Sequence, residues 1–149
     1  MKNLPFILKL SITLILFFSI SIKAYANSLD EGIELFNNDE FKKSKFLFEK
    51  NLVFNPKSEK SYLYLAKIFS KEEKEEEQER NLNSVLLLNP KNEEAVYMLT
   101  LLKIKQSNYE MAKELIQKFS IICISLCSKK TEINDKFKKL TPENAKNNN

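Results

Sequence analysis

Two Asn-Pro pairs, Asn55-Pro56 and Asn89-Pro90, recur with a 34-residue spacing. Each pair ends a stretch in which apolar residues recur at steps of three and four, the spacing of one face of an α-helix. Proline ends such a stretch because it lacks an amide hydrogen and restricts the residue before it. A period of about 34 residues is the length of one helix–turn–helix unit in a repeat protein. The spacing therefore predicts an all-α fold made of stacked helix pairs.

The glycine content agrees with this fold class. The chain has 149 residues and one glycine. β-Sandwiches and β-barrels use glycine at many of their turns, so the composition argues against them.

Residues 1–26 have the organisation of a secretory signal peptide. Two lysines and no acid precede an uncharged run that extends from position 10 to position 22, and Ala24 and Ala26 follow in an A-x-A pattern. An uncleaved membrane anchor is the alternative, but a run of this length rises only about 20 Å as a helix, less than the roughly 30 Å of a bilayer core. We expect cleavage after Ala26, and in a bacterium with two membranes the product would lie in the periplasm.

The basic charge belongs largely to this segment. The formal charge of the whole chain is +4, and Lys2, Lys9 and Lys23 leave with the signal peptide, which lowers it to +1. Nucleic-acid-binding domains present a basic stripe on the folded domain. We therefore expect no nucleic-acid partner.

Residue types recur in phase along three units, residues 28–56, 57–90 and from 91 onward. The aromatic residues Phe41 and Tyr109 lie two full periods apart, and so do the small residues Ser44 and Ala112. Small residues let paired helices approach closely, and large apolar residues fill the space between pairs.

Over residues 28–124 the chain resembles the tetratricopeptide repeat (TPR) family. Units of that family have a small residue on the first helix, an aromatic, a small and a large apolar residue on the second, and a closing proline. The resemblance implies a short right-handed α-solenoid of about three repeats that binds protein partners. The matching residues are Gly32 and Ala66; Phe41 and Tyr109; Ser44 and Ala112; Phe48, Leu82 and Ile116; and Pro56 and Pro90.

Five positions depart from the family pattern. Glu75 and Gln78 take the aromatic and small positions of the second unit, and Lys103 takes an aromatic position of the third. Thr100 replaces the small residue of the third unit, and Ile124 stands where a third proline is expected. We therefore expect the second helix of unit two to be loosely docked at its start. The charged run over residues 71–80 is interpreted as a solvated turn and first helical turn; an acidic docking patch or a cation site is the alternative.

A further amphipathic helix follows the third unit. Ile133, Phe137 and Leu140 form a narrow apolar stripe, which predicts a helix that caps the solenoid; a membrane-surface helix is the alternative. We expect the repeat domain to span residues 27–140 and residues 141–149 to be a disordered tail.

The resemblance also implies a ligand groove along the inner faces of the first helices. Its lining is mostly apolar, so we expect it to hold a short peptide or an amphipathic helix. The expected lining residues are Leu29, Ile33, Lys60, Leu63, Lys67, Tyr97 and Leu101.

The two cysteines are predicted to form a disulfide across a turn. Residues four apart on one helix have Cβ atoms about 5–6 Å apart, whereas a disulfide needs about 3.5–4.5 Å. Adding the period to Pro90 places the turn at Ile124, between Cys123 and Cys127. An oxidising compartment favours the bond. A redox-active pair and two free thiols are the alternatives.

No catalytic motif is present. The chain has no histidine, no nucleophile-elbow motif and no glycine-rich phosphate loop, and two cysteines alone make a poor zinc site. We expect no enzyme activity, no cofactor and no bound metal.

Three functions remain open. The first is an exported, non-enzymatic adaptor that binds a protein or peptide; the second is a structural subunit of a cell-envelope complex. The third is a small redox or metal protein that uses Cys123 and Cys127.

Overall fold

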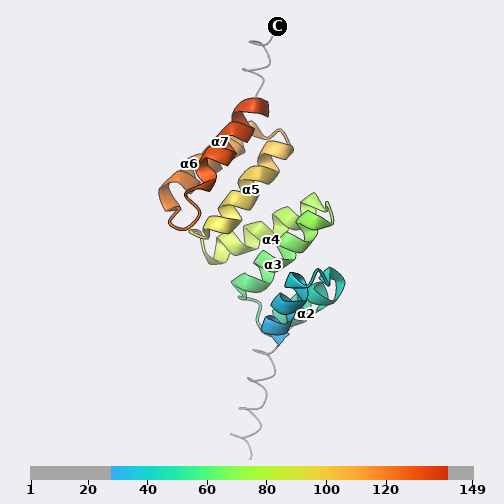
Figure 1. Ribbon diagram of the computed structural model, residues 1–149. Coiled ribbons are helices and arrows are strands. Elements are labelled where there is room, and N and C mark those ends of the chain that lie inside the picture. The colour runs from blue at the N-terminus through green and yellow to red at the C-terminus, as the bar shows by residue number, and fades with distance from the viewer. Residues whose placement is uncertain (1–27, 141–149) are drawn as a thin grey trace, which may run out of the picture. The chain divides into compact units, whose positions relative to one another are not determined.

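The computed structural model describes residues 28–140, which form seven helices and no strand (Figure 1). The predicted all-α fold is confirmed. The predicted signal peptide and the predicted C-terminal tail lie outside the described residues. Residues 28–37 are helical, and they are followed by α2 (Phe41–Phe54), α3 (Glu59–Lys71), α4 (Glu75–Leu88), α5 (Glu93–Lys105), α6 (Tyr109–Ile122) and α7 (Lys129–Leu140).

The helix boundaries follow the 34-residue period. The second helices of the three units, α2, α4 and α6, begin and end one period after one another, and so do α3 and α5. The chain leaves α2 and α4 through equivalent bonds, in which the Asn55 amide donates to the Asn51 carbonyl at 2.8 Å and the Asn89 amide to the Val85 carbonyl at 2.7 Å. The prolines after these asparagines then prevent continuation of the helix.

The turn within each unit is also repeated, without glycine. Asp39, Glu73 and Ser107 follow one another at one period, and their φ angles are 60°, 57° and 57°. Each follows a first helix that ends in a Schellman motif, a pair of bonds that satisfies the last carbonyls. The bonds that close the three motifs, each 2.9 Å long, run from the amides of Glu40, Lys74 and Asn108 to the carbonyls of Leu35, Phe69 and Lys103.

The chain divides into two compact units between Ser61 and Tyr62, within α3. In the first unit, helix 28–37 crosses α2 at Gly32. The Phe48 ring is fully buried, and a Cβ atom added to Gly32 would lie 3.0 Å from its nearest carbon. Ser44 Oγ donates a hydrogen bond to the Gly32 carbonyl at 2.7 Å. The small residues at positions 32 and 44 thus allow the close approach that the sequence predicts.

In the second unit, α5 is the central helix and packs against α4, α6 and α7. It is apolar on most sides, because it must meet three neighbours. The core lies around it and consists of Leu63, Ala66, Leu82, Val85, Ala95, Val96, Leu99, Leu102, Ile104, Ala112, Leu115, Phe119 and Ile133.

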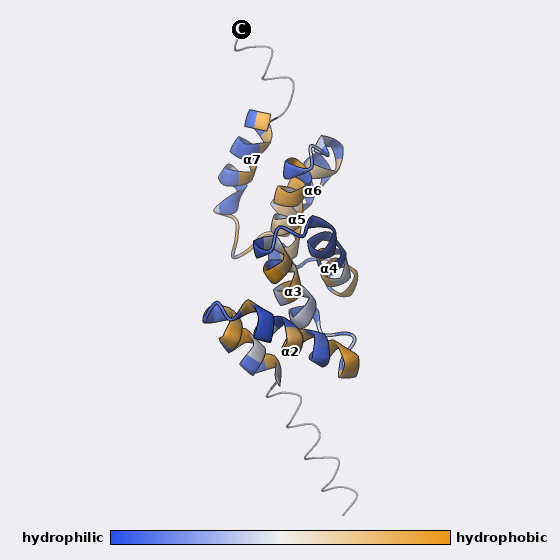
Figure 2. Ribbon diagram, turned by 90° about the vertical axis from the view of Figure 1, so that its right-hand side faces the viewer, coloured by the Kyte–Doolittle hydropathy of each residue, from blue (hydrophilic) through white to orange (hydrophobic). Residues whose placement is uncertain are grey.

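The helix α7 covers the end of this core, as predicted for a capping helix. Ile133 is 1% exposed, and the Phe137 ring packs edge-to-face on Tyr109 with centroids 6.2 Å apart. Leu140, the last member of the predicted stripe, is instead 53% exposed. Apart from its apolar stripe, α7 is strongly hydrophilic (Figure 2).

Candidate functional site

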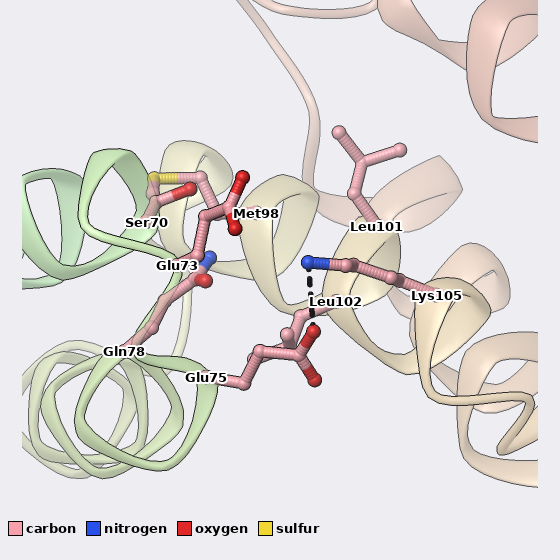
Figure 3. Close-up of a pocket in the computed structure, with 8 residues that line it drawn as sticks. All are labelled: Ser70, Glu73, Glu75, Gln78, Met98, Leu101, Leu102 and Lys105. Atoms are coloured by element: carbon pink, nitrogen blue, oxygen red, sulfur yellow. Dashed lines mark ion pairs between the residues drawn. The ribbon is translucent and has the colours of Figure 1, made fainter.

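A hollow of about 150 Å³ opens beside α5, where the turn between α3 and α4 approaches it (Figure 3). Apolar side chains of α5 line one part of it, and polar side chains from the α3–α4 region, together with Lys105 of α5, line the rest. The lining residues are Ser70, Glu73, Glu75, Gln78, Met98, Leu101, Leu102 and Lys105.

Two carboxylates and one ammonium group lie around this hollow. Lys105 Nζ lies 2.7 Å from Glu75 Oε1, and Gln106 Nε2 donates to Glu75 Oε2 at 3.3 Å. The hydrogen bond from Lys105 lowers the pKa of Glu75 and, with the charge of Glu75 and more weakly that of Glu73, raises the pKa of Lys105. Within residues 28–140 the Glu73 side chain has no hydrogen-bond or ion-pair partner.

The start of α4 is held against α5, contrary to the expectation of loose docking. Gln78 is 7% exposed, and Lys103, 6% exposed, places its Nζ 2.5 Å from Glu79 Oε1 and donates to Gln106 Oε1 at 3.0 Å. Two of the residues that depart from the family pattern, Glu75 and Lys103, thus have ion-pair partners across the α4–α5 contact. The charged run is solvated only in part, because Glu75 and Glu79 turn toward lysines of α5.

The four predicted groove residues in the second unit have different environments. Lys67 pairs with Glu94 of α5 at 2.8 Å, and its Nζ lies 4.7 Å from the ring centroid of Tyr64. Leu101 lines the hollow. Leu63 is only 9% exposed and belongs to the core, which leaves little of its side chain for a ligand.

Tyr97, the fourth of these, is engaged by α7. Its hydroxyl donates to Glu132 Oε1 at 2.9 Å, and its pKa is raised, first by burial and then by this bond. Glu132 also accepts from Lys129 at 2.9 Å and Lys136 at 3.0 Å. Hydrogen bonds from Lys129, Lys136 and Tyr97 together lower the pKa of Glu132 to about 2.

The other three predicted groove residues lie in the first unit. Leu29 and Ile33 are half-buried, and Lys60 is exposed. Because the seven residues come from both units, their assembly into one groove stays a prediction.

The cysteines lie where the period places a turn. The helix α6 ends at Ile122 and α7 begins at Lys129, and between them the sulfurs of Cys123 and Cys127 are 2.12 Å apart, with Cα atoms 5.2 Å apart. The predicted geometry, a cysteine pair across a turn, is confirmed. Whether the thiols are oxidised in the cell stays a prediction.

A carboxylate that the sequence analysis missed holds this turn. Glu93, the first residue of α5, accepts hydrogen bonds from the Leu126 amide at 2.8 Å and from the Ser125 amide at 3.0 Å. Backbone hydrogen bonds from Leu126, Ile124 and Ser125 lower the pKa of Glu93. An acid in the first turn of a helix usually indicates only a favourable interaction with the helix dipole, so no pattern in the sequence pointed to this distant partner.

No protein-family model matches the chain, and no curated protein matches it at a significant level. Among solved structures, one match is the C-terminal TPR-containing domain of a Plasmodium falciparum protein described as an FK506-binding protein, with a TM-score of 0.67 and 18% identity over 84% of this chain and 91% of that one. Another is a chain of the CopN-Scc3 complex, with a TM-score of 0.67 and 20% identity over 80% of this chain and 72% of that one.

The fold is TPR-like. The residues that carry this TPR-like fold agree with the resemblance, since Gly32, Ser44 and Phe48 meet at one helix crossing and Ala112 is fully buried. In the described part of the chain, no helix is both long and apolar enough to cross a membrane.

Proposed function

We propose that this protein is an exported, non-enzymatic adaptor that binds a short peptide or an amphipathic helix of a partner protein. The observation that carries the proposal is the TPR-like fold with an open, partly apolar hollow beside α5. Helical repeat proteins bind their partners on the extended concave surfaces that their stacked repeats create. The match to a chain from a complex of two proteins is in keeping with this role.

Site-specific cross-linking tests the location of the binding surface. Ser70 is exposed and lines the hollow, so a photo-reactive residue placed there should form a covalent adduct with the partner in living cells. The control position is Lys113, which is exposed on α6 and does not line the hollow. A discrete adduct from position 70 and none from position 113 is expected. Equal adducts at both positions, or none at either, would contradict the proposal.

Export to the periplasm is a separate part of the proposal. It is supported by the signal-peptide pattern of residues 1–26, with cleavage expected after Ala26. Intact-mass measurement of the protein from a periplasmic fraction should give a chain that begins at Asn27. A chain that retains Met1 in washed membranes would contradict it.

A structural subunit of an envelope complex is the second candidate function. Val53, Leu87 and Ile121 occupy the same position at the ends of α2, α4 and α6, and they are 76%, 84% and 84% exposed. Apolar residues repeated in phase at exposed positions suit a permanently buried contact. Size-exclusion chromatography of the isolated protein separates the two functions, because an adaptor should be monomeric alone and a structural subunit should associate or aggregate.

A further inference from the structure

We propose that the hollow beside α5 accepts a lysine or arginine side chain of the bound peptide. This inference rests on the proposed function and adds the chemistry of one contact. Three properties of the hollow carry it: its volume, its apolar wall and its charge.

The volume suits one side chain. A cavity of about 150 Å³ is large enough to hold a benzene-sized molecule, and the hollow has this volume. Its wall on α5 is formed by Met98, Leu101 and Leu102. A lysine or arginine can lay its methylene stem on such a wall while its charged end stays near water at the mouth.

The charge of the hollow selects a cation. Glu73 and Glu75 contribute two negative charges and Lys105 contributes one positive charge, so one negative charge is left over. Lys105 is already paired with Glu75, whereas the Glu73 carboxylate has no ion-pair partner among the described residues. In Figure 3 the carboxylate of Glu73 and the ammonium group of Lys105 extend into the same space from opposite sides. An incoming cation would pair with Glu73.

Other occupants fit less well. An acidic side chain would add a third carboxylate to the two already present. A purely apolar side chain would cover Glu73 without giving it a partner, and a covered carboxylate without a partner is costly. The segment that leads into α4 strengthens the preference, since Glu76 and Glu77 follow Glu75 directly.

The inference can be tested with displayed peptides. A library of random 15-residue peptides is selected against the immobilised full chain. We expect enriched peptides to share one lysine or arginine flanked by apolar residues. An enriched arginine peptide is then synthesised with arginine and with citrulline, which keeps the shape and removes the charge. Citrulline should weaken binding by up to about fivefold, the range of an exposed ion pair.

A double-mutant cycle assigns the contact to Glu73. The protein variant Glu73→Gln should weaken binding of the arginine peptide as much as the change from arginine to citrulline does. With that variant, the citrulline peptide should bind no more weakly than the arginine peptide. Glu76→Gln is the matched control, because Glu76 is an exposed acid of the same segment that does not line the hollow. Ser70→Lys places a competing cation at the hollow and should also remove the preference for arginine.

The outcomes separate the inference from the function on which it rests. Enriched peptides without a shared basic residue, or additive effects of citrulline and Glu73→Gln, would refute the cation site and leave peptide binding intact. The absence of any enriched peptide would refute peptide binding and the cation site together. Circular dichroism of each variant verifies that the helices are retained.

Discussion

Replacement of the single glycine by alanine sets two effects of known size against each other. Gly32 lies within a helix, where alanine is more favourable than glycine by about 0.8–1.0 kcal/mol. The added Cβ would lie 3.0, 3.2 and 3.3 Å from three carbons of the Phe48 ring. The ring is fully buried, so it cannot move aside without displacing other side chains. Overpacking of this kind costs about 1–3 kcal/mol.

The steric cost should therefore exceed the gain in helix propensity. We expect Gly32→Ala to lower the free energy of unfolding by up to about 2 kcal/mol, measured by urea denaturation followed by circular dichroism. The variant Phe48→Leu provides the control. In that background the ring is absent, so only the gain in helix propensity remains, and Gly32→Ala should raise the free energy of unfolding by about 1 kcal/mol or less. If Gly32→Ala stabilises the protein with Phe48 in place, the helix crossing is looser than the geometry requires and the reasoning fails.

Four further predictions concern single positions. Ala112 is fully buried, so Ala112→Leu should destabilise by about 1–3 kcal/mol, and an unchanged melting temperature would contradict its place at a helix crossing. Ser107 has a φ of 57°, so Ser107→Gly should stabilise by about 0.5–1 kcal/mol in urea denaturation. The pKa of Glu132 is lowered from 4.5 to about 2, so its contribution to stability is complete above pH 4.5 and is lost as the pH falls toward 2. Glu132→Gln should therefore lose less stability than the unmodified protein over that interval. A pH profile identical to that of the unmodified protein would argue against the hydrogen bonds that Glu132 accepts from Lys129, Lys136 and Tyr97. Non-reducing mass spectrometry of freshly exported protein should find Cys123 and Cys127 joined, at a mass about 2 Da below the dithiol; two free thiols would contradict this.

The helix pairs could be predicted because their information is local and repeated. Pro56 and Pro90 mark two helix ends directly, and the pairs Phe41–Tyr109 and Ser44–Ala112 fix the phase of the second helices. Each of these residues influences the helices through its own size or backbone chemistry. A periodic pattern in the sequence shows size and backbone chemistry directly, even when the residue that packs against each position is not known.

The polar contacts could not be predicted in the same way. In the sequence, Glu79 belongs to a charged run that is expected at the surface, and Lys103 occupies an aromatic position of the repeat. Only the packing of α4 on α5 makes them partners. Glu93 likewise reaches a turn that follows the next helix of the chain. The positive φ of Glu73 could not be expected either, because glutamate is rare in that conformation.

The predicted groove shows a further limit. Helical spacing places Leu63 and Leu101 on related faces of their helices, but their burial depends on the neighbours. Leu63 is enclosed in the core, whereas Leu101 reaches the hollow. A pattern that predicts which face of a helix is apolar does not show whether that face meets the protein or a ligand.

The ion pairs between α4 and α5 make the coupling of two successive repeats depend on ionic strength. In a repeat protein, the strength of each junction decides how far local unfolding spreads. Salt screens partly exposed pairs such as Glu75–Lys105, whereas the apolar contact of α5 with α6 is not weakened by screening. Leu82 and Val85 still hold α4 in the shared core, so we expect concentrated salt to speed hydrogen exchange in α4 relative to α5 and α6, without separating it from them.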